Sequence, residues 1–235
     1  QPAVELIAVD LDGTLLRRDR TPAPEGSRAL ARAAAKGVHV VLATTRTPDS
    51  VRRFAGDIGL NQPLICTNGA QIFASPSGPT WAHLALNPEL ARAVAELCDE
   101  RGWSLITTVG ETTYYRQRAG QTLGPSGPHR VVVSQNTDAL RTMEAEGGVV
   151  RILTYEAEAI PQIWQFCASN FSGQYYLETY YYPDETVKSM GIYAPGADKG
   201  TALTLVLDRL QVRPQRVLAI GDNPNDLPKF AHAEI

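Results

Sequence analysis

Short apolar runs alternate with longer segments of good helix formers at the start of this chain. The runs cover residues 7–9, 38–43 and 63–67, and the segments between them cover residues 25–36 and 48–56. Apolar runs of this length predict buried strands, and the longer segments, closed by glycine or opened by proline, predict helices. This alternating order is typical of a parallel sheet with helices on both faces. We therefore expect an α/β fold with a doubly wound, Rossmann-like parallel sheet.

The pattern changes at residues 75–79, where serine, proline and glycine predict a domain boundary. Beyond this break, helices and strands follow one another in an order that predicts an α+β domain. The predicted helices are 88–102, 138–146 and 156–171, and the predicted strands are 103–109, 112–116, 149–155 and 175–182. The first pattern resumes before the apolar run 217–220. We therefore expect a core of residues 1–78 and 194–235 and a second domain of residues 79–193.

Two features of the second domain invite a functional interpretation. Residues 120–128 form a loop rich in glycine and proline, and the strand 175–182 is dense in tyrosine. Tyrosines on that strand could stack against a carbohydrate, but the alternation of side chains along a strand favours packing for half of them. The scattered histidines belong to no motif, and we assign them no chemistry.

Net charge, hydropathy and cysteine content limit the kinds of binding partner that we expect. The net charge is −3 and charged residues make up 20% of the chain, which argues against nucleic acid or an anionic membrane as the main partner. No apolar run approaches the length of a membrane span. Cys66, Cys98 and Cys167 are odd in number and lack metal-ligand spacing, so we expect buried, reduced thiols and a cytoplasmic protein.

Two aspartates directly follow the first apolar run. Asp10 and Asp12 are separated by one residue, and Gly13 and Thr14 come next. In extended backbone the two carboxylates would share a face, where they repel each other unless a cation or a proton separates them. The pair therefore indicates a hard metal ion, a shared proton or both. Taken alone, it is also compatible with a calcium loop or a solvated turn.

Polar groups follow other predicted strands or begin a helix in the same way. Thr44, Thr45 and Arg46 follow the second strand, Lys199 lies at a predicted helix start, and residues 221–226 follow the run 217–220. Open α/β sheets bind ligands at the carboxyl ends of their strands, so these segments predict one common pocket. The alternatives are a solvated lysine and a polar turn that caps a helix.

Together these segments resemble the motifs of haloacid dehalogenase-superfamily phosphatases of the Cof-type (type IIB) group. Residues 10–14 match the family's Asp-x-Asp-Gly-Thr, and residues 44–46 match Thr-Gly-Arg except that Thr45 replaces glycine. Lys199 and Gly200 match its Lys-Gly motif, and residues 221–226 match Gly-Asp-x-x-Asn-Asp. The group's Asn-Gly-Ala is matched by residues 68–70. The motifs lie in the family's order, and the resemblance implies that residues 79–193 are a type IIB cap domain.

The resemblance also implies a role for each motif residue. Asp10 would be the nucleophile that forms an aspartyl-phosphate, and Asp12 would be the general acid and base. Lys199 and Thr44 would stabilise the transferring phosphoryl group. The Mg²⁺ ligands would be the Asp10 and Asp222 carboxylates and the Asp12 backbone carbonyl, with Asp226 orienting groups around the metal. Residues implied in phosphate or substrate binding are Leu11, Gly13, Thr45, Arg46, Asn68, Gly69 and Asn225.

The expected function is Mg²⁺-dependent hydrolysis of phosphate monoesters of small metabolites, with sugar phosphates first among them. A sugar phosphomutase, or a catalytically idle binding or regulatory protein on the same fold, is the alternative. The ending Gly13-Thr14 resembles phosphatases more than mutases, and the presence of every catalytic side chain argues against an idle protein. The sequence makes no prediction of oligomeric state. The family continues beyond its fourth motif with further strands, so we expect either a missing tail or a short native chain, and processing or omission before Gln1.

Overall fold

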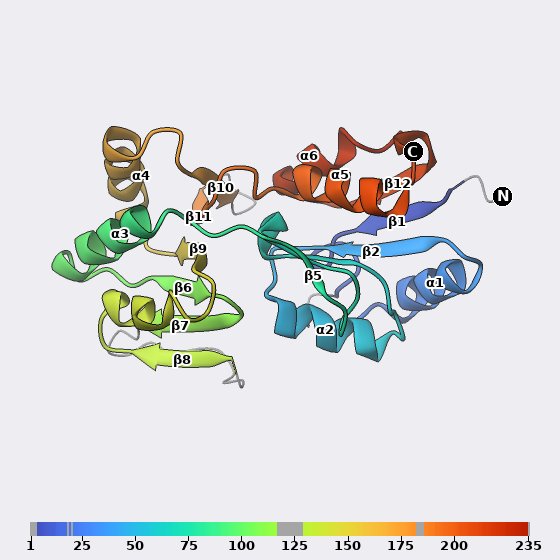
Figure 1. The fold of residues 1–235 in the computed structure, drawn as a ribbon, viewed down its shortest axis with the longest axis horizontal. Helices are drawn as coiled ribbons and strands as arrows, with labels where there is room; N and C mark the ends of the chain where they lie inside the picture. The colour runs from blue at the N-terminus through green and yellow to red at the C-terminus, as the bar shows by residue number, and fades with distance from the viewer. Residues whose placement is uncertain (1–3, 18, 20, 117–128, 182–185, 235) are drawn as a thin grey trace. The chain divides into compact units, whose positions relative to one another are not determined.

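The computed structural model describes residues 4–17, 19, 21–116, 129–181 and 186–234. The chain divides into two compact units (Figure 1). Unit 1 consists of Gln1–His83 and Gly196–Ile235, and unit 2 of Leu84–Pro195. Each unit has a sheet and a core of its own, and each is described separately below.

Unit 1 is built on a six-stranded sheet with the order β12-β1-β2-β3-β4-β5. The strands are β1 (Leu6–Val9), β2 (His39–Ala43), β3 (Leu64–Cys66), β4 (Gln71–Phe73), β5 (Thr80–His83) and β12 (Val217–Ile220). β12, β1, β2 and β3 pair in parallel, as the alternating sequence pattern predicted.

The hairpin of β4 and β5 was not predicted. Both strands pair antiparallel, β4 with β3 and β5 with β4, so only the larger part of the sheet is parallel. The break at residues 75–79 is the turn of this hairpin, and the division between the units falls after His83 instead of after residue 78. The reason is that Ile72 and Phe73 are buried and extend the core beyond β3, so the glycine and proline mark a hairpin turn and not a domain boundary.

Helices cover both faces of the unit 1 sheet. On one face, α1 (Pro24–Ala35) and α2 (Pro48–Asp57) contribute Leu30 and Phe54 to a buried cluster that includes Val9. On the other face, α5 (Lys199–Leu210) contributes Leu203 to a cluster that includes Ala8. Adjacent residues of β1 thus enter different cores, because strand side chains alternate and both faces of a parallel sheet are buried.

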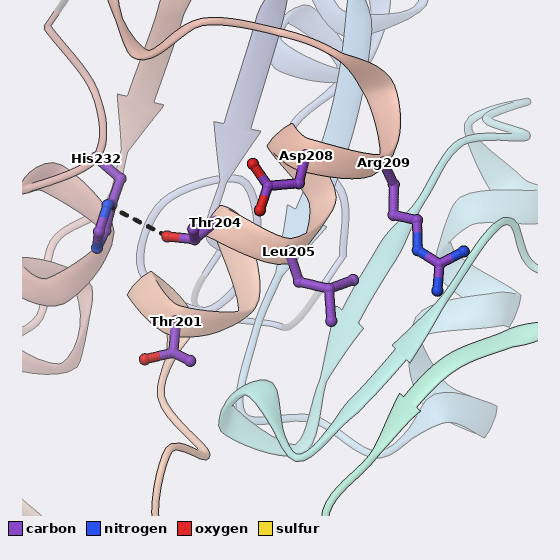
Figure 2. A pocket seen from close by; sticks show the side chains of 6 residues that line it. All are labelled: Thr201, Thr204, Leu205, Asp208, Arg209 and His232. Carbon is purple, nitrogen blue, oxygen red and sulfur yellow. Dashed lines mark hydrogen bonds between the residues drawn. The ribbon is translucent and has the colours of Figure 1, made fainter.

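The outer face of α5 bears an open hollow of about 650 Å³ (Figure 2). Thr204 and His232 lie within hydrogen-bonding distance there, at 3.3 Å, and Arg209 lies 5.9 Å from the Trp81 ring. The residues around the hollow are Thr201, Thr204, Leu205, Asp208, Arg209 and His232. None of them is a residue that the sequence predicted for the site.

Unit 2 is a second six-stranded sheet, with the order β10-β11-β9-β6-β7-β8. Its strands are β6 (Ile106–Val109), β7 (Thr112–Arg116), β8 (Arg130–Val133), β9 (Val149–Thr154), β10 (Tyr176–Tyr181) and β11 (Val187–Tyr193). All pairs are antiparallel except β7 with β8. β8 and β11 were not predicted, and the helix predicted at 138–146 is a 3-10 segment, Asn136–Thr142.

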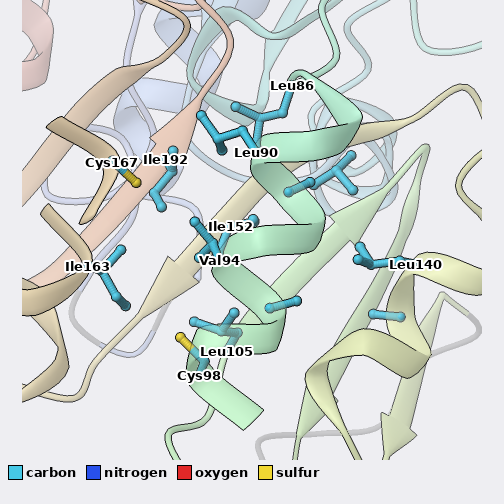
Figure 3. Close-up of a cluster of buried hydrophobic side chains, with 14 of the residues drawn as sticks. Leu86, Leu90, Val94, Cys98, Leu105, Leu140, Ile152, Ile163, Cys167 and Ile192 are labelled. Carbon is cyan, nitrogen blue, oxygen red and sulfur yellow. The ribbon is translucent and has the colours of Figure 1, made fainter. Parts of the chain in front are cut away.

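The described α-helices of unit 2 pack on one face of its sheet, and Figure 3 shows buried hydrophobic side chains of the cluster that they form with it. Leu90 of α3 (Pro88–Glu100) and Ile163 of α4 (Ala159–Asn170) pack in one cluster with Ile152 and Ile192. Cys98 and Cys167 belong to the same cluster, and burial raises the pKa of the Cys98 thiol to about 12. The expectation of buried, reduced thiols is confirmed, since Cys66 is buried as well and none of the three cysteines forms a disulfide.

The other face of this sheet carries polar side chains. Tyr176 pairs with Tyr193 across the strands, and the Tyr193 ring lies over Gly191, where a Cβ atom would overlap it. The Tyr180 hydroxyl is 3.1 Å from that of Tyr193, and the Tyr176 hydroxyl donates to Glu178 at 2.5 Å. Burial raises the pKa of Tyr180 well above its ordinary value.

The tyrosine-rich run therefore divides as strand alternation predicted. Tyr175 packs against the apolar cluster, whereas Tyr176 and Tyr180 lie on the polar face. Tyr182 and the loop 120–128 lie outside the described residues. No described helix of either unit is long and apolar enough to cross a bilayer.

Candidate active site

The predicted site residues of unit 1 gather at the carboxyl ends of its parallel strands. Asp10 follows β1, Thr44 follows β2, and Asp222 lies two residues after β12. Backbone pairing continues one residue beyond the strands: the Asp10 N–H donates to the Ile220 carbonyl at 3.0 Å, and the Thr44 N–H to the Ile65 carbonyl at 2.9 Å. The strand ends are therefore held side by side, as the order of a doubly wound sheet requires.

Lys199 joins two buried carboxylates. Its Nζ atom donates to Asp10 Oδ1 and to Asp226 Oδ1, each at 2.8 Å. The exposed side-chain fractions are 1% for Lys199, 5% for Asp10 and 0% for Asp226. A buried charge is stable only when it is paired and hydrogen-bonded, so Lys199 is not the solvated lysine of the alternative interpretation.

The two carboxylates respond differently to this environment. Burial raises the pKa of Asp10 above its ordinary value, although Lys199 opposes the shift. Burial acts in the same direction on Asp226, but the attraction of Lys199 and Lys229 outweighs it and holds the pKa of Asp226 below its ordinary value.

Asp10, Asp222 and Asp226 form an acidic cluster, with one oxygen of each within 4.8 Å of the others. Both oxygens of Asp226 already accept hydrogen bonds, because Oδ2 receives the backbone N–H groups of Asp222 and Asn223 at 3.2 Å. Asp222 is exposed, and its Oδ1 accepts from Thr14 at 2.7 Å. Carboxylate oxygens suit Mg²⁺, and the donor set fits that ion with Asp10 and Asp222 as ligands and Asp226 as their organiser.

Gly13 allows the loop after β1 to approach Asp222. Its φ of +86° lies in the left-handed region, and a Cβ atom at this position would overlap the Asp222 carboxylate. Gly221 has a similar constraint, because its Cβ atom would overlap the Asp226 carboxylate. Glycine at both positions keeps the acidic groups close together.

The predicted general acid and base, Asp12, is paired with Arg46. The Arg46 Nε atom donates to Asp12 Oδ2 at 2.7 Å, and Nη2 donates to Oδ1 at 2.6 Å. This is a two-point pairing of a guanidinium with a carboxylate, and the hydrogen bonds to Asp12 raise the pKa of Arg46. Nη1 of Arg46 also donates to Ser50 at 3.2 Å. The structure thus brings Arg46 to Asp12.

The loop after β2 places Thr44 in the interior. Thr44 is fully buried, and its hydroxyl accepts the Arg46 backbone N–H at 3.2 Å. Thr45, which replaces the family's glycine, is partly buried beside Thr44. In the loop after β1, the side chain of Leu11 is buried in the core. Leu11 can therefore serve a ligand through its backbone only.

Asn68 and Gly69 lie in the 3-10 segment Thr67–Gly69, which follows β3 and packs against the start of α5. Asn68 has a φ of 57° and donates to the Ala197 carbonyl at 3.4 Å, and its buried Oδ1 has no partner among the described residues. A Cβ atom at Gly69 would overlap the Asp198 backbone, and the Asp198 side chain caps α5 by accepting from the Gly200 N–H at 2.8 Å. These two residues therefore contact the helix start that carries Lys199.

The loop 223–226 combines a helix cap with the site. Asn223 and Asp226 form a capping box, so the interpretation of a polar turn that caps a helix is correct but incomplete. Asn225 is buried, and its Oδ1 also has no partner in the described part of the chain.

Lys229 is a site residue that the sequence analysis missed. It is fully buried in α6 (Leu227–Phe230) and donates to Asp226 Oδ1 at 3.0 Å and to the Ile220 carbonyl at 2.8 Å. Burial lowers the pKa of Lys229. Its spacing of three residues from Asp226 was the signal available, since such residues are neighbours on a helix.

Comparisons with known proteins identify the family of the chain. Residues 7–235 match the family of haloacid dehalogenase-like hydrolases. The pyridoxal phosphate phosphatase of Escherichia coli is 26% identical over 232 residues, covering 94% of this chain and 82% of that protein. A 5-amino-6-(5-phospho-D-ribitylamino)uracil phosphatase of Bacillus subtilis is 40% identical over 72 residues, which are 31% of this chain and 29% of that protein.

The fold is shared with solved structures. A haloacid dehalogenase-like hydrolase from Bacteroides thetaiotaomicron superposes with a TM-score of 0.81 at 18% identity, covering 99% of this chain and 86% of that one. A sugar phosphatase of subclass IIB superposes with a TM-score of 0.75 at 20% identity, covering 99% and 86%. The predicted fold class and the predicted class of enzyme, a phosphoric monoester hydrolase, are confirmed. The chain belongs to the haloacid dehalogenase-like hydrolases.

Proposed function

We propose that the protein is a Mg²⁺-dependent phosphatase that hydrolyses phosphate monoesters of small metabolites, sugar phosphates first among them, through an aspartyl-phosphate on Asp10. The observation that carries this proposal is the buried Asp10–Lys199–Asp226 chain beside the Asp222 carboxylate. It unites a carboxylate nucleophile, a cation and an acidic cluster within one group of strand ends.

The first step is attack of an Asp10 oxygen on phosphorus. An acyl phosphate bond forms, and the bond from phosphorus to the ester oxygen breaks. Lys199 donates to Asp10 Oδ1, which leaves Oδ2 as the attacking atom, and its charge lowers the repulsion between Asp10 and the phosphoryl oxygens. Bound Mg²⁺, held by Asp10 and Asp222, would supply further positive charge at the phosphoryl group.

We assign the proton transfer of both steps to Asp12. As an acid it protonates the departing alkoxide, and as a base it takes a proton from the water that hydrolyses the acyl phosphate. Its two hydrogen bonds from Arg46 fix the orientation of the carboxylate. Arg46 is thus proposed to position Asp12.

We assign the choice of leaving group to unit 2, as a type IIB cap. The motif residues of phosphoryl transfer all belong to unit 1. On the sheet face opposite its described helices, unit 2 carries hydroxyl, carboxylate and guanidinium groups, among them Tyr180, Glu178 and Arg151. Such groups suit ligands rich in hydroxyls. The related phosphatases act on compounds with a phosphorylated ribityl or pyridoxal group, which supports small phosphorylated metabolites as substrates.

Turnover of para-nitrophenyl phosphate with and without Mg²⁺ tests the proposal. We expect release of inorganic phosphate that depends on Mg²⁺ and is lost after chelation. Absence of turnover with this ester and with a panel of phosphorylated sugars and cofactors would favour the idle binding protein. An isomerised sugar phosphate in place of free phosphate would identify a mutase. The buried thiols support a cytoplasmic location, which fractionation of the source cells would test.

A further inference from the structure

We propose that Lys229 is a positioning residue of the phosphoryl-transfer site, whose buried positive charge weakens Mg²⁺ binding and strengthens phosphate binding. The inference rests on the proposed function and deepens it. Lys229 lies outside the four motifs, three residues beyond the last of them.

Lys229 differs from the exposed lysines of the chain. Lys36 and Lys188 are exposed, whereas Lys199 and Lys229 are buried. Both buried ammonium groups donate to one atom, Asp226 Oδ1, at 2.8 and 3.0 Å. Lys229 therefore reaches the catalytic cluster through a single carboxylate oxygen.

The buried charges of the cluster balance only when Lys229 is counted. In their ionised forms, Asp10 and Asp226 carry two negative charges, and Lys199 and Lys229, which pair with them, carry two positive charges. The exposed Asp222 then supplies the remaining negative charge toward a cation. Without Lys229, the buried group would carry a net negative charge, which attracts Mg²⁺ and repels a phosphate dianion.

Lys229 also connects two backbone segments of the site through hydrogen bonds. Its Nζ atom ties the carbonyl of Ile220, at the end of β12, to Asp226. Asp226 in turn holds the Asp222 and Asn223 backbone N–H groups. A purely structural role would predict that loss of this link loosens the loop and weakens Mg²⁺ and phosphate binding together. A charge role predicts opposite changes for the two ligands.

Three substitutions separate these roles. Lys229→Met removes the charge and keeps the length of the side chain, Lys229→Gln removes the charge but can still donate to a carbonyl, and Lys229→Arg keeps the charge. Lys36→Met is the matched control, because it removes one positive charge from the exposed surface of the same unit. Thermal unfolding of each variant verifies that it is folded.

Titration calorimetry with Mg²⁺ alone, and inhibition by inorganic phosphate, are the measurements. We expect Lys229→Gln and Lys229→Met to bind Mg²⁺ on the order of tenfold more tightly and phosphate on the order of tenfold more weakly, as expected for one partly screened charge. Lys229→Arg and Lys36→Met should stay within about twofold of the parent protein for both ligands.

Weaker binding of both ligands in a folded Lys229→Gln variant would overturn the charge role, and so would unchanged binding of both. If these results came with an active parent protein that binds Mg²⁺, the proposed function would stand and this inference alone would fail. A parent protein that neither binds Mg²⁺ nor releases phosphate would overturn the proposed function and the inference with it.

Discussion

Units 1 and 2 both combine a six-stranded sheet with helices, but they place their polar groups differently. In unit 1, helices cover both faces of the sheet, and the side chains of the candidate site come from the loops at the strand ends and from α5 and α6. In unit 2, helices cover one face, and the polar groups lie on the other face of the sheet itself. A sheet with both faces covered leaves its strand ends as the place for chemistry, whereas a sheet with helices on one face can carry polar groups on its other face.

The buried charges show the same contrast. In unit 1, Asp10, Asp226, Lys199 and Lys229 are buried ions whose positions depend on one another. In unit 2, the buried carboxylate of Glu178 accepts a hydrogen bond from the Tyr176 hydroxyl, and Tyr180 and Tyr193 are neutral groups whose hydroxyls pair with each other. Loss of one buried ion leaves its partner unpaired, but loss of one hydroxyl costs about one hydrogen bond. We therefore expect substitutions in unit 1 to affect the reaction itself and those in unit 2 to affect substrate choice.

The largest effect is expected from Asp10→Asn. Without the nucleophile, no phosphoenzyme should form from any substrate, and the activity should fall by on the order of 10⁴-fold or more. Rapid-quench trapping of protein-bound phosphate is the measurement. Asp49→Asn, which removes a carboxylate paired with Arg53 on α2, should keep near-normal activity. Trapped phosphoenzyme in Asp10→Asn would show that another residue of the site is the nucleophile.

Asp12→Asn should have the next largest effect. General acid and base groups contribute about 10²–10⁴-fold, and the loss should be smallest for para-nitrophenyl phosphate, whose leaving group needs little protonation. The second step still needs the base, so phosphoenzyme should accumulate with this substrate. Quench trapping and a Mg²⁺ titration test both points. Normal Mg²⁺ binding without any trapped phosphoenzyme would contradict the role given to Asp12.

Gly13→Ala should lower Mg²⁺ affinity, because the added methyl group overlaps the Asp222 carboxylate. We expect on the order of tenfold weaker binding by calorimetry, as is typical when the group that orients a ligand is disturbed. Gly59→Ala is a matched control, since Gly59 also has positive φ, +69°, but nothing lies near its Cβ position. Both variants should lose some stability through backbone strain. Equal loss of Mg²⁺ affinity in both would rule out the specific contact with Asp222.

The smallest effect is expected in unit 2. Tyr180→Phe removes the hydroxyl pair with Tyr193 and should lower the free energy of unfolding by about 1 kcal/mol. It should also change the order of preferred substrates in a panel of phosphorylated sugars and cofactors, while phosphoenzyme still forms. Tyr181→Phe, in which an exposed side chain changes, should do neither. Loss of phosphoenzyme with every substrate in a folded Tyr180→Phe variant would contradict the assignment of substrate choice to unit 2 and of phosphoryl transfer to unit 1.

The sequence by itself determined the larger part of unit 1. Apolar runs that end in aspartate, threonine or glycine predicted β1, β2, β3 and β12 and the residues at their ends, because a parallel strand buried on both faces must be apolar along its length. The motif spacing predicted the enzyme family and the class of reaction. The roles of the individual site residues and the Mg²⁺ ligands remain proposals that the substitutions above would test.

Only the tertiary structure decided the β4–β5 hairpin, the strand β11 and the role of Lys229. The hairpin of β4 and β5 lies across a run of serine, proline and glycine that marks a turn or a boundary equally well, and burial of Phe73 is what joins it to the core. β11 mixes polar residues with Gly191, whose role becomes clear only beneath the Tyr193 ring. Lys229 shows the same limit: a lone lysine in a sequence is normally solvated, and only the closure of β12 and α6 around Asp226 gives it a buried partner.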